Sequence, residues 1–156
     1  MKESYEIGSE GNTDQPNQWL PEDVLPGFHK FTTDFYWECH GAAEEIMSAM
    51  ALGIGLDDEN YFRPAHTGHN NQLRLLHYPP VPASVIESGQ AIRLDAHSDW
   101  PSITLLFQDD CGGLQIENPN AKGEFIDVPP LKDAIVMNLG DLMMRWTNGT
   151  ITRLPR

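Results

Sequence analysis

Hydrophobic residues recur at intervals of three and four positions through the first third of the chain. The pattern begins after Pro26–Gly27 and is carried by Phe28, Phe31, Phe35, Cys39, Ala42, Ile46 and Met50. This spacing places apolar side chains on one face of an α-helix. We therefore predict an amphipathic helix of about six turns, which ends near Gly53 and Gly55. A short helix is predicted to follow from Asp57 to Phe62.

From Leu73 onward the pattern changes to short apolar runs separated by Pro, Gly and Asp. Strands are predicted over residues 73–78, 103–107, 114–117, 125–128 and 134–139. Helices followed by several short strands predict an α+β fold, in which N-terminal helices pack on a sandwich or barrel such as a jelly roll. Residues 1–16 are polar and acidic without periodicity, which predicts a disordered arm ahead of one domain over residues 17–156.

Composition and charge narrow the classes of partner. The chain has 156 residues, 40% of them hydrophobic, and a net charge of −13. Residues 1–60 hold 13 acidic side chains against Lys2 and Lys30, so the acidity is concentrated in the N-terminal part. A chain this acidic repels phosphate backbones and anionic lipids, which excludes nucleic acid and membrane as expected partners. With no apolar stretch of about 20 residues, no secretory pattern and no paired cysteine motif, we expect a cytoplasmic protein.

The tripeptide His97-Ser98-Asp99 precedes the apolar run 102–107 and is the best candidate for chemistry. On a strand, alternate side chains point to the same face, so the imidazole and the carboxylate can both bind one cation. One His and one carboxylate are two thirds of the facial triad that holds Fe(II) in non-haem oxygenases. Another candidate, the acidic pair Asp109-Asp110, is followed by Gly112 and Gly113, a pattern more typical of a hairpin turn than of a metal site.

Several ordered motifs resemble the Fe(II)/2-oxoglutarate-dependent dioxygenases of the isopenicillin N synthase type. They occupy residues 17–21, 25–28, 73–79, 97–100, 103–110, 112–115, 138–142 and 145–149. The resemblance implies that His97 and Asp99 are metal ligands for Fe(II), and that Tyr78, which precedes Pro79, helps to bind the cosubstrate 2-oxoglutarate. It also implies a double-stranded β-helix, or jelly roll, as the fold.

The last residues depart from this family's pattern. Asn148–Gly149 matches the turn that leads to the distal His ligand, but here the sequence continues from Thr150 to Arg156 without a His. We therefore expect a C-terminally truncated, incomplete jelly roll that lacks the distal His and the Arg-x-Ser pair for 2-oxoglutarate. Loss of these groups should weaken binding of both metal and cosubstrate. Unpaired strand edges should favour self-association.

The resemblance implies an oxidoreductase that acts on a small organic molecule, in specialised metabolite biosynthesis. Two alternatives stay open. One is an inactive pseudoenzyme or binding module that keeps the pocket of Tyr78, His97 and Asp99 without oxidation. The other is a metal-free cyclase or isomerase that uses His97 and Asp99 as an acid–base pair at hydrogen-bond distance. The three hypotheses differ in whether they need Fe(II).

Overall fold

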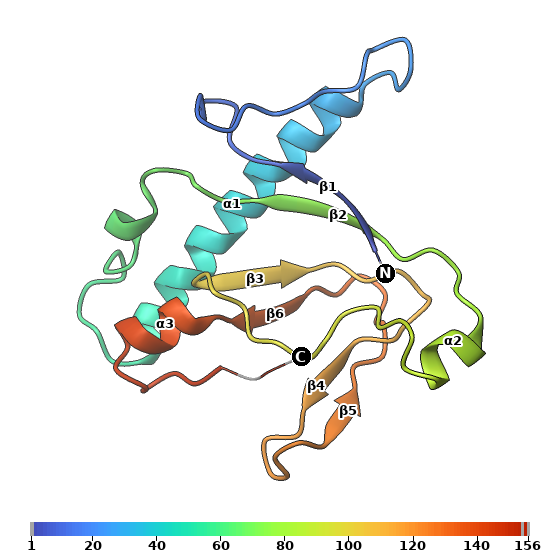
Figure 1. Cartoon of the computed structure of the whole chain (residues 1–156). Coiled ribbons are helices and arrows are strands. Elements are labelled where there is room, and N and C mark those ends of the chain that lie inside the picture. Colours follow the sequence, from blue (N-terminus) through green and yellow to red (C-terminus); the bar gives the residue numbers. More distant parts are fainter. Residues whose placement is uncertain (1, 154, 156) are drawn as a thin grey trace. The chain divides into compact units, whose positions relative to one another are not determined.

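The computed structural model describes residues 2–153 and 155, which form two compact units divided after Leu94. The elements of the first unit are β1 (Glu3–Ile7), α1 (Phe28–Gly53), the 3-10 helix η1 (Arg63–His66), β2 (Leu73–His77) and α2 (Ala83–Glu87) (Figure 1). Those of the second unit are β3 (Ile103–Leu106), β4 (Gln115–Glu117), β5 (Phe125–Asp127), β6 (Val136–Leu139) and α3 (Asp141–Trp146). Among these helices, none combines the length and the hydropathy needed to span a bilayer.

The long amphipathic helix is confirmed as α1. It begins after Gly27, whose positive φ of 75° turns the chain into the helix, and it ends at Gly53. The buried line of side chains differs by one position from the predicted stripe, because Thr32 and Tyr36 are buried whereas Phe31 is 70% exposed. Hydrophobic spacing alone therefore predicted the length of the helix but misjudged which face is covered.

The predicted short helix over residues 57–62 is wrong. Asp58 accepts a hydrogen bond from the backbone N–H of Asn60 at 2.9 Å, a local turn that competes with a helix. The helical turn begins later, as η1, where Pro64 occupies one of the first positions. Proline suits the start of a helix because its missing N–H has no intrahelical partner there.

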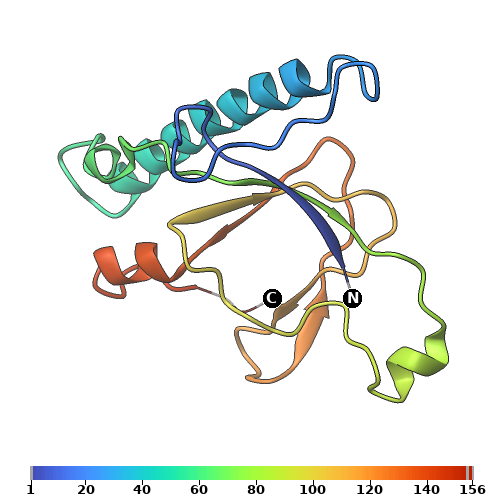
Figure 2. The ribbon, with the colours of Figure 1, turned by 45° about the horizontal axis from the view of Figure 1, so that its top comes forward.

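The N-terminal segment contains a strand, where the sequence predicts a disordered arm. Strand β1 pairs antiparallel with β2, from Glu3 opposite His77 to Ile7 opposite Leu73, and both views show the two strands side by side (Figures 1 and 2). Ile7 is only 1% exposed. Ladder hydrogen bonds order this segment, and an acidic composition does not reveal them.

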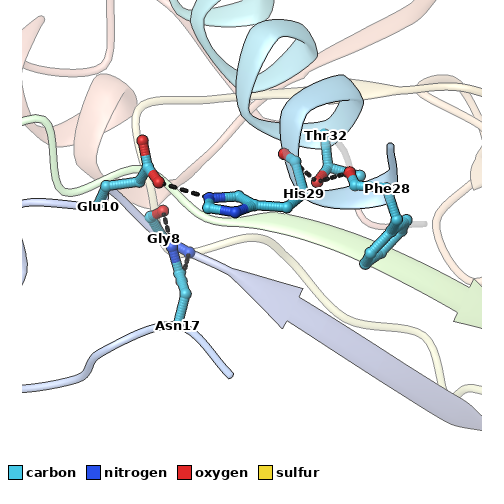
Figure 3. A network of polar contacts seen from close by, with 6 residues as sticks. All are labelled: Gly8, Glu10, Asn17, Phe28, His29 and Thr32. Atoms are coloured by element: carbon cyan, nitrogen blue, oxygen red, sulfur yellow. Dashed lines mark hydrogen bonds and ion pairs between the residues drawn. The ribbon is translucent and has the colours of Figure 1, made fainter. Parts of the chain in front are cut away.

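A polar network holds the turn after β1, as Figure 3 shows. The Asn17 amide donates to the Gly8 carbonyl at 2.9 Å, and its oxygen accepts from the Gly8 N–H at 2.8 Å. Glu10 Oε1 lies at hydrogen-bond distance from Nε2 of His29 in α1, at 2.7 Å. Side chains therefore fix a segment that has few apolar residues of its own.

The strands of the second unit form two antiparallel pairs, β3 with β6 and β4 with β5. The register of β3 and β6 places Ile103 opposite Leu139 and Thr104 opposite Asn138. All five predicted strands are present, shortened by one or two residues at their ends. The mixture of helices and antiparallel strands is thus confirmed, while the described strands make separate two-stranded sheets.

Candidate metal centre

The segment that carries His97 and Asp99 is irregular, so its prediction as a strand is wrong. Its backbone bonds to the start of α3 instead of to a sheet. The Asp141 N–H donates to the Asp99 carbonyl at 2.8 Å, and the Gly140 N–H donates to the Ser102 carbonyl at 3.0 Å. These bonds fix the segment against the end of β6, and they satisfy N–H groups that a helix start leaves without partners.

This close approach depends on glycine at position 140. A Cβ atom built on Gly140 would lie 1.9 Å from the Pro101 carbonyl oxygen and 2.7 Å from that of Asp99. Both neighbours are backbone atoms, so no side-chain rotation relieves the overlap. The backbone of Gly140 is extended, with φ −100° and ψ −178°, so the requirement for glycine comes from space and not from a left-handed conformation.

His97 and Asp99 face one another. The distance from His97 Nε2 to Asp99 Oδ1 is 3.6 Å, and their side chains are 36% and 11% exposed. His97 Nδ1 lies 2.8 Å from the Asp95 carbonyl oxygen. Because a carbonyl only accepts, Nδ1 carries the hydrogen, which leaves a lone pair on Nε2 for a metal ion.

These two atoms fit one cation. Histidine nitrogen and carboxylate oxygen bind a first-row ion such as zinc at about 2.1 Å, so two such ligands lie about 3.0 Å apart at a right angle and at most about 4.2 Å apart. The observed 3.6 Å falls between these limits. An imidazole with a carboxylate is also the donor set that suits Fe(II) in oxygenases.

The second oxygen of Asp99 is held by a residue that the sequence reasoning missed. Asn138 of β6 donates from Nδ2 to Asp99 Oδ2 at 2.8 Å. The amide oxygen of Asn138 is buried and has no hydrogen-bond partner among the described residues. The signal was available, because Asn138 interrupts an otherwise apolar strand, and a polar side chain there needs a partner.

A third protein ligand is not found within the described part of the chain. No other His, Cys, Asp or Glu there offers a ligand atom that completes a group of three with His97 and Asp99 within 4.8 Å. The one group of this kind among the described residues contains Asp109, Asp110 and Cys111, all exposed. Asp109 accepts a hydrogen bond from the Cys111 N–H at 2.9 Å, as expected for a turn.

Tyr78 lies in the first unit, directly after β2, and is half-buried. The neighbouring His77 is turned to β1, where its Nδ1 lies 2.8 Å from Glu3 Oε2. The role of Tyr78 in binding 2-oxoglutarate stays a prediction.

The sequence profile of the 2OG-Fe(II) oxygenase superfamily matches residues 69–155, which include Tyr78, His97, Asp99 and Asn138. The chain belongs to this superfamily. The family predicted from the motifs is thereby confirmed, and membership implies Fe(II) and 2-oxoglutarate as cofactor and cosubstrate.

Relatives of this chain agree with the assignment to the superfamily. It is 41% identical to the 2-oxoglutarate-dependent dioxygenase htyE of Aspergillus rugulosus, over 95% of this chain and 44% of that protein. It is 38% identical to the proline hydroxylase buaE of Petromyces alliaceus, over 95% of this chain and 46% of that protein. A crystal structure of a full-length Neurospora crassa protein in complex with alpha-KG and thymine matches with a TM-score of 0.90 and 45% identity, over 99% of this chain and 46% of that one. The chain thus spans about half the length of the relatives it matches.

Proposed function

We propose that this chain carries part of the active site of an Fe(II)/2-oxoglutarate-dependent oxygenase that oxidises a small organic molecule, with His97 and Asp99 as iron ligands. The observation that carries the proposal is the pair of ligand atoms, His97 Nε2 and Asp99 Oδ1, 3.6 Å apart. The hydrogen bond from Nδ1 to the Asp95 carbonyl supports it, because it leaves Nε2 in the form that binds metal.

The reaction proposed is a hydroxylation coupled to oxidation of the cosubstrate. One O2 and one 2-oxoglutarate react with a substrate C–H group, giving the alcohol, succinate and CO2. One oxygen atom enters the alcohol and the other enters the new carboxylate of succinate. Bound Fe(II) supplies open positions for O2 and for the cosubstrate and the electrons that activate O2.

The protein's own contribution is to hold the ligands and to bind the organic molecules. The Asp95 carbonyl orients His97, and the backbone bond from Asp141 holds Asp99. Tyr78 is proposed to bind 2-oxoglutarate, through the phenol hydroxyl that its side chain offers as a donor. We also propose that the strand pairs β3–β6 and β4–β5 are parts of a jelly roll, the fold of the oxygenases that this chain resembles.

A small organic substrate is supported by the relatives. One is named a proline hydroxylase, and the Neurospora crassa protein was crystallised with thymine. Both molecules are small and polar. The net charge of −13 adds support, because it disfavours a nucleic-acid or membrane substrate. Self-association through the edges of the two-stranded sheets stays a prediction, because each such edge carries backbone groups that can pair with another chain.

The distance between His97 and Asp99 also bears on the metal-free alternative. An acid–base pair requires contact at about 2.6–3.2 Å, whereas 3.6 Å separates Nε2 from Oδ1. The observed separation is longer than a direct hydrogen bond and lies within the range for two ligands of one cation, so it supports the metal-binding hypothesis more than the acid–base pair.

The test is an anaerobic titration of the protein with Fe²⁺ in the presence of 2-oxoglutarate, followed by visible absorption of the chelated complex. We expect a band that is absent in His97→Ala and retained in His77→Ala. His77 is a matched control because its side chain is 67% exposed and pairs with Glu3. A folded protein that shows no band, or a band unchanged in His97→Ala, would contradict the proposed site.

A further inference from the structure

The carboxylate of Asp99 has two oxygens in different environments. Oδ1 faces His97, whereas Oδ2 accepts a hydrogen bond from Asn138 Nδ2 at 2.8 Å. The side chain of Asp99 is 11% exposed, so little water competes for this bond. A hydrogen bond to an ionised carboxylate in such a place is stronger than one between neutral groups.

Asn138 is itself held rigidly. It lies within β6, opposite Thr104 of β3, and its backbone belongs to the antiparallel ladder. The orientation of its amide group is set by chemistry, because a carboxylate only accepts and so must meet the NH₂ end. The amide oxygen is then left buried without a hydrogen-bond partner among the described residues.

An unpaired buried carbonyl oxygen is unfavourable, so this arrangement needs a compensating reason. Residues that orient metal ligands give one, since second contacts of this kind fix the geometry of a metal site. We propose that Asn138 is a positioning residue that reserves Oδ2 of Asp99, so that Asp99 binds the metal through Oδ1 alone. Monodentate binding leaves one more position on the ion for other ligands. This inference rests on the proposed iron site.

The inference makes two measurable statements about Asn138→Leu, which keeps the branching of the side chain at Cγ but has no donor. Metal affinity falls by about 10–100-fold, the usual effect of losing such a contact. In addition, Oδ2 of Asp99 loses the hydrogen bond from Asn138 and can bind the ion together with Oδ1, so the coordination of the bound ion changes. A merely structural role for Asn138 would not alter the spectrum of the ion at saturation.

The probe is Co²⁺ alone, which has visible bands that report coordination number and which binds nitrogen and oxygen sites somewhat more tightly than Fe²⁺. Wild type, Asn138→Leu, Asn118→Leu and His97→Ala are titrated as folded chains of all 156 residues. Asn118 is the matched control, because it lies in the same unit and its Oδ1 accepts the turn N–H of Asn120, at 3.0 Å, away from Asp99 in the hydrogen bonds of the described residues.

We expect weaker binding and an altered saturated spectrum in Asn138→Leu, with wild-type behaviour in Asn118→Leu. Should Asn138→Leu fail to fold, Asn138→Ala gives the same test with a smaller side chain. An Asn138 variant that binds Co²⁺ with wild-type affinity and spectrum overturns the inference. If His97→Ala also binds like wild type, the iron site itself is wrong; if His97→Ala loses binding while the Asn138 variant keeps it, only the positioning role fails.

Discussion

Replacement of Gly140 by alanine should disturb the candidate metal centre without touching a metal ligand. The new methyl group would lie 1.9 Å from the Pro101 carbonyl oxygen, and a Cβ atom essentially never comes closer than 3.0 Å to another heavy atom. The two segments must therefore separate by about 1 Å, the difference between these two distances. Asp99 moves with them, because its carbonyl oxygen is also within 2.7 Å of the new atom.

The Gly140→Ala substitution should lower both the stability of the protein and its affinity for metal. Overpacking costs typically 1–3 kcal/mol and sometimes more, and because only backbone can move here we expect a loss of about 3 kcal/mol in the free energy of unfolding. For a chain of this size that corresponds to a fall in Tm of roughly 6–12 °C. Metal geometry is less tolerant, since ligand distances must hold within about 0.2 Å. We therefore expect Co²⁺ affinity to fall by about 100-fold or more.

Thermal unfolding of the metal-free protein and a Co²⁺ titration measure the two effects. Gly41→Ala is the control, because Gly41 lies within α1 and no atom lies within 4 Å of a Cβ built there. It should stabilise the protein by up to about 1 kcal/mol, through the higher helix propensity of alanine. A Gly140→Ala protein with the Tm and the Co²⁺ affinity of wild type would refute the reasoning.

Two further predictions concern the first unit. Asn17→Ala removes both hydrogen bonds to Gly8. Limited proteolysis should therefore cleave the chain faster near the N-terminus, and the free energy of unfolding should fall by about 1–3 kcal/mol. An unchanged cleavage rate would contradict the role of Asn17 in ordering this segment. Tyr36→Phe removes a bond to the His69 carbonyl and should cost about 1 kcal/mol at pH 7. Burial raises the pKa of Tyr36 in the folded protein. The contribution of the Tyr36 hydroxyl to the free energy of unfolding is therefore complete below the ordinary tyrosine pKa of about 10, and it is lost as the pH rises through the higher pKa of the folded state. Denaturant unfolding at several pH values should therefore show a smaller alkaline loss in the variant, and equal losses would contradict this.

Element type was predictable wherever the hydrophobic period was strong. The helix from Phe28 and the apolar runs of the second half were predicted as the correct elements because their side chains repeat with the geometry of a helix or a strand. Strand β1 was missed because it is polar and is ordered by pairing with β2, about 70 residues away along the chain. The segment of His97 and Asp99 was predicted as a strand because alternate side chains point the same way in any extended backbone. This pattern does not distinguish a strand paired in a sheet from an extended segment that is hydrogen-bonded to the start of a helix.

The sequence by itself determined the family and the identity of the two candidate ligands, because His97 and Asp99 stand in a series of ordered motifs whose residue types carry the chemistry. Tertiary structure alone decided that Nε2 and Oδ1 face one another and that Asn138 holds the second oxygen. It also decided that Gly140 leaves no room for a side chain. Asn138 lies 39 residues from Asp99 along the chain, and contacts over such separations depend on the register of β3 against β6, which no local pattern of residues specifies.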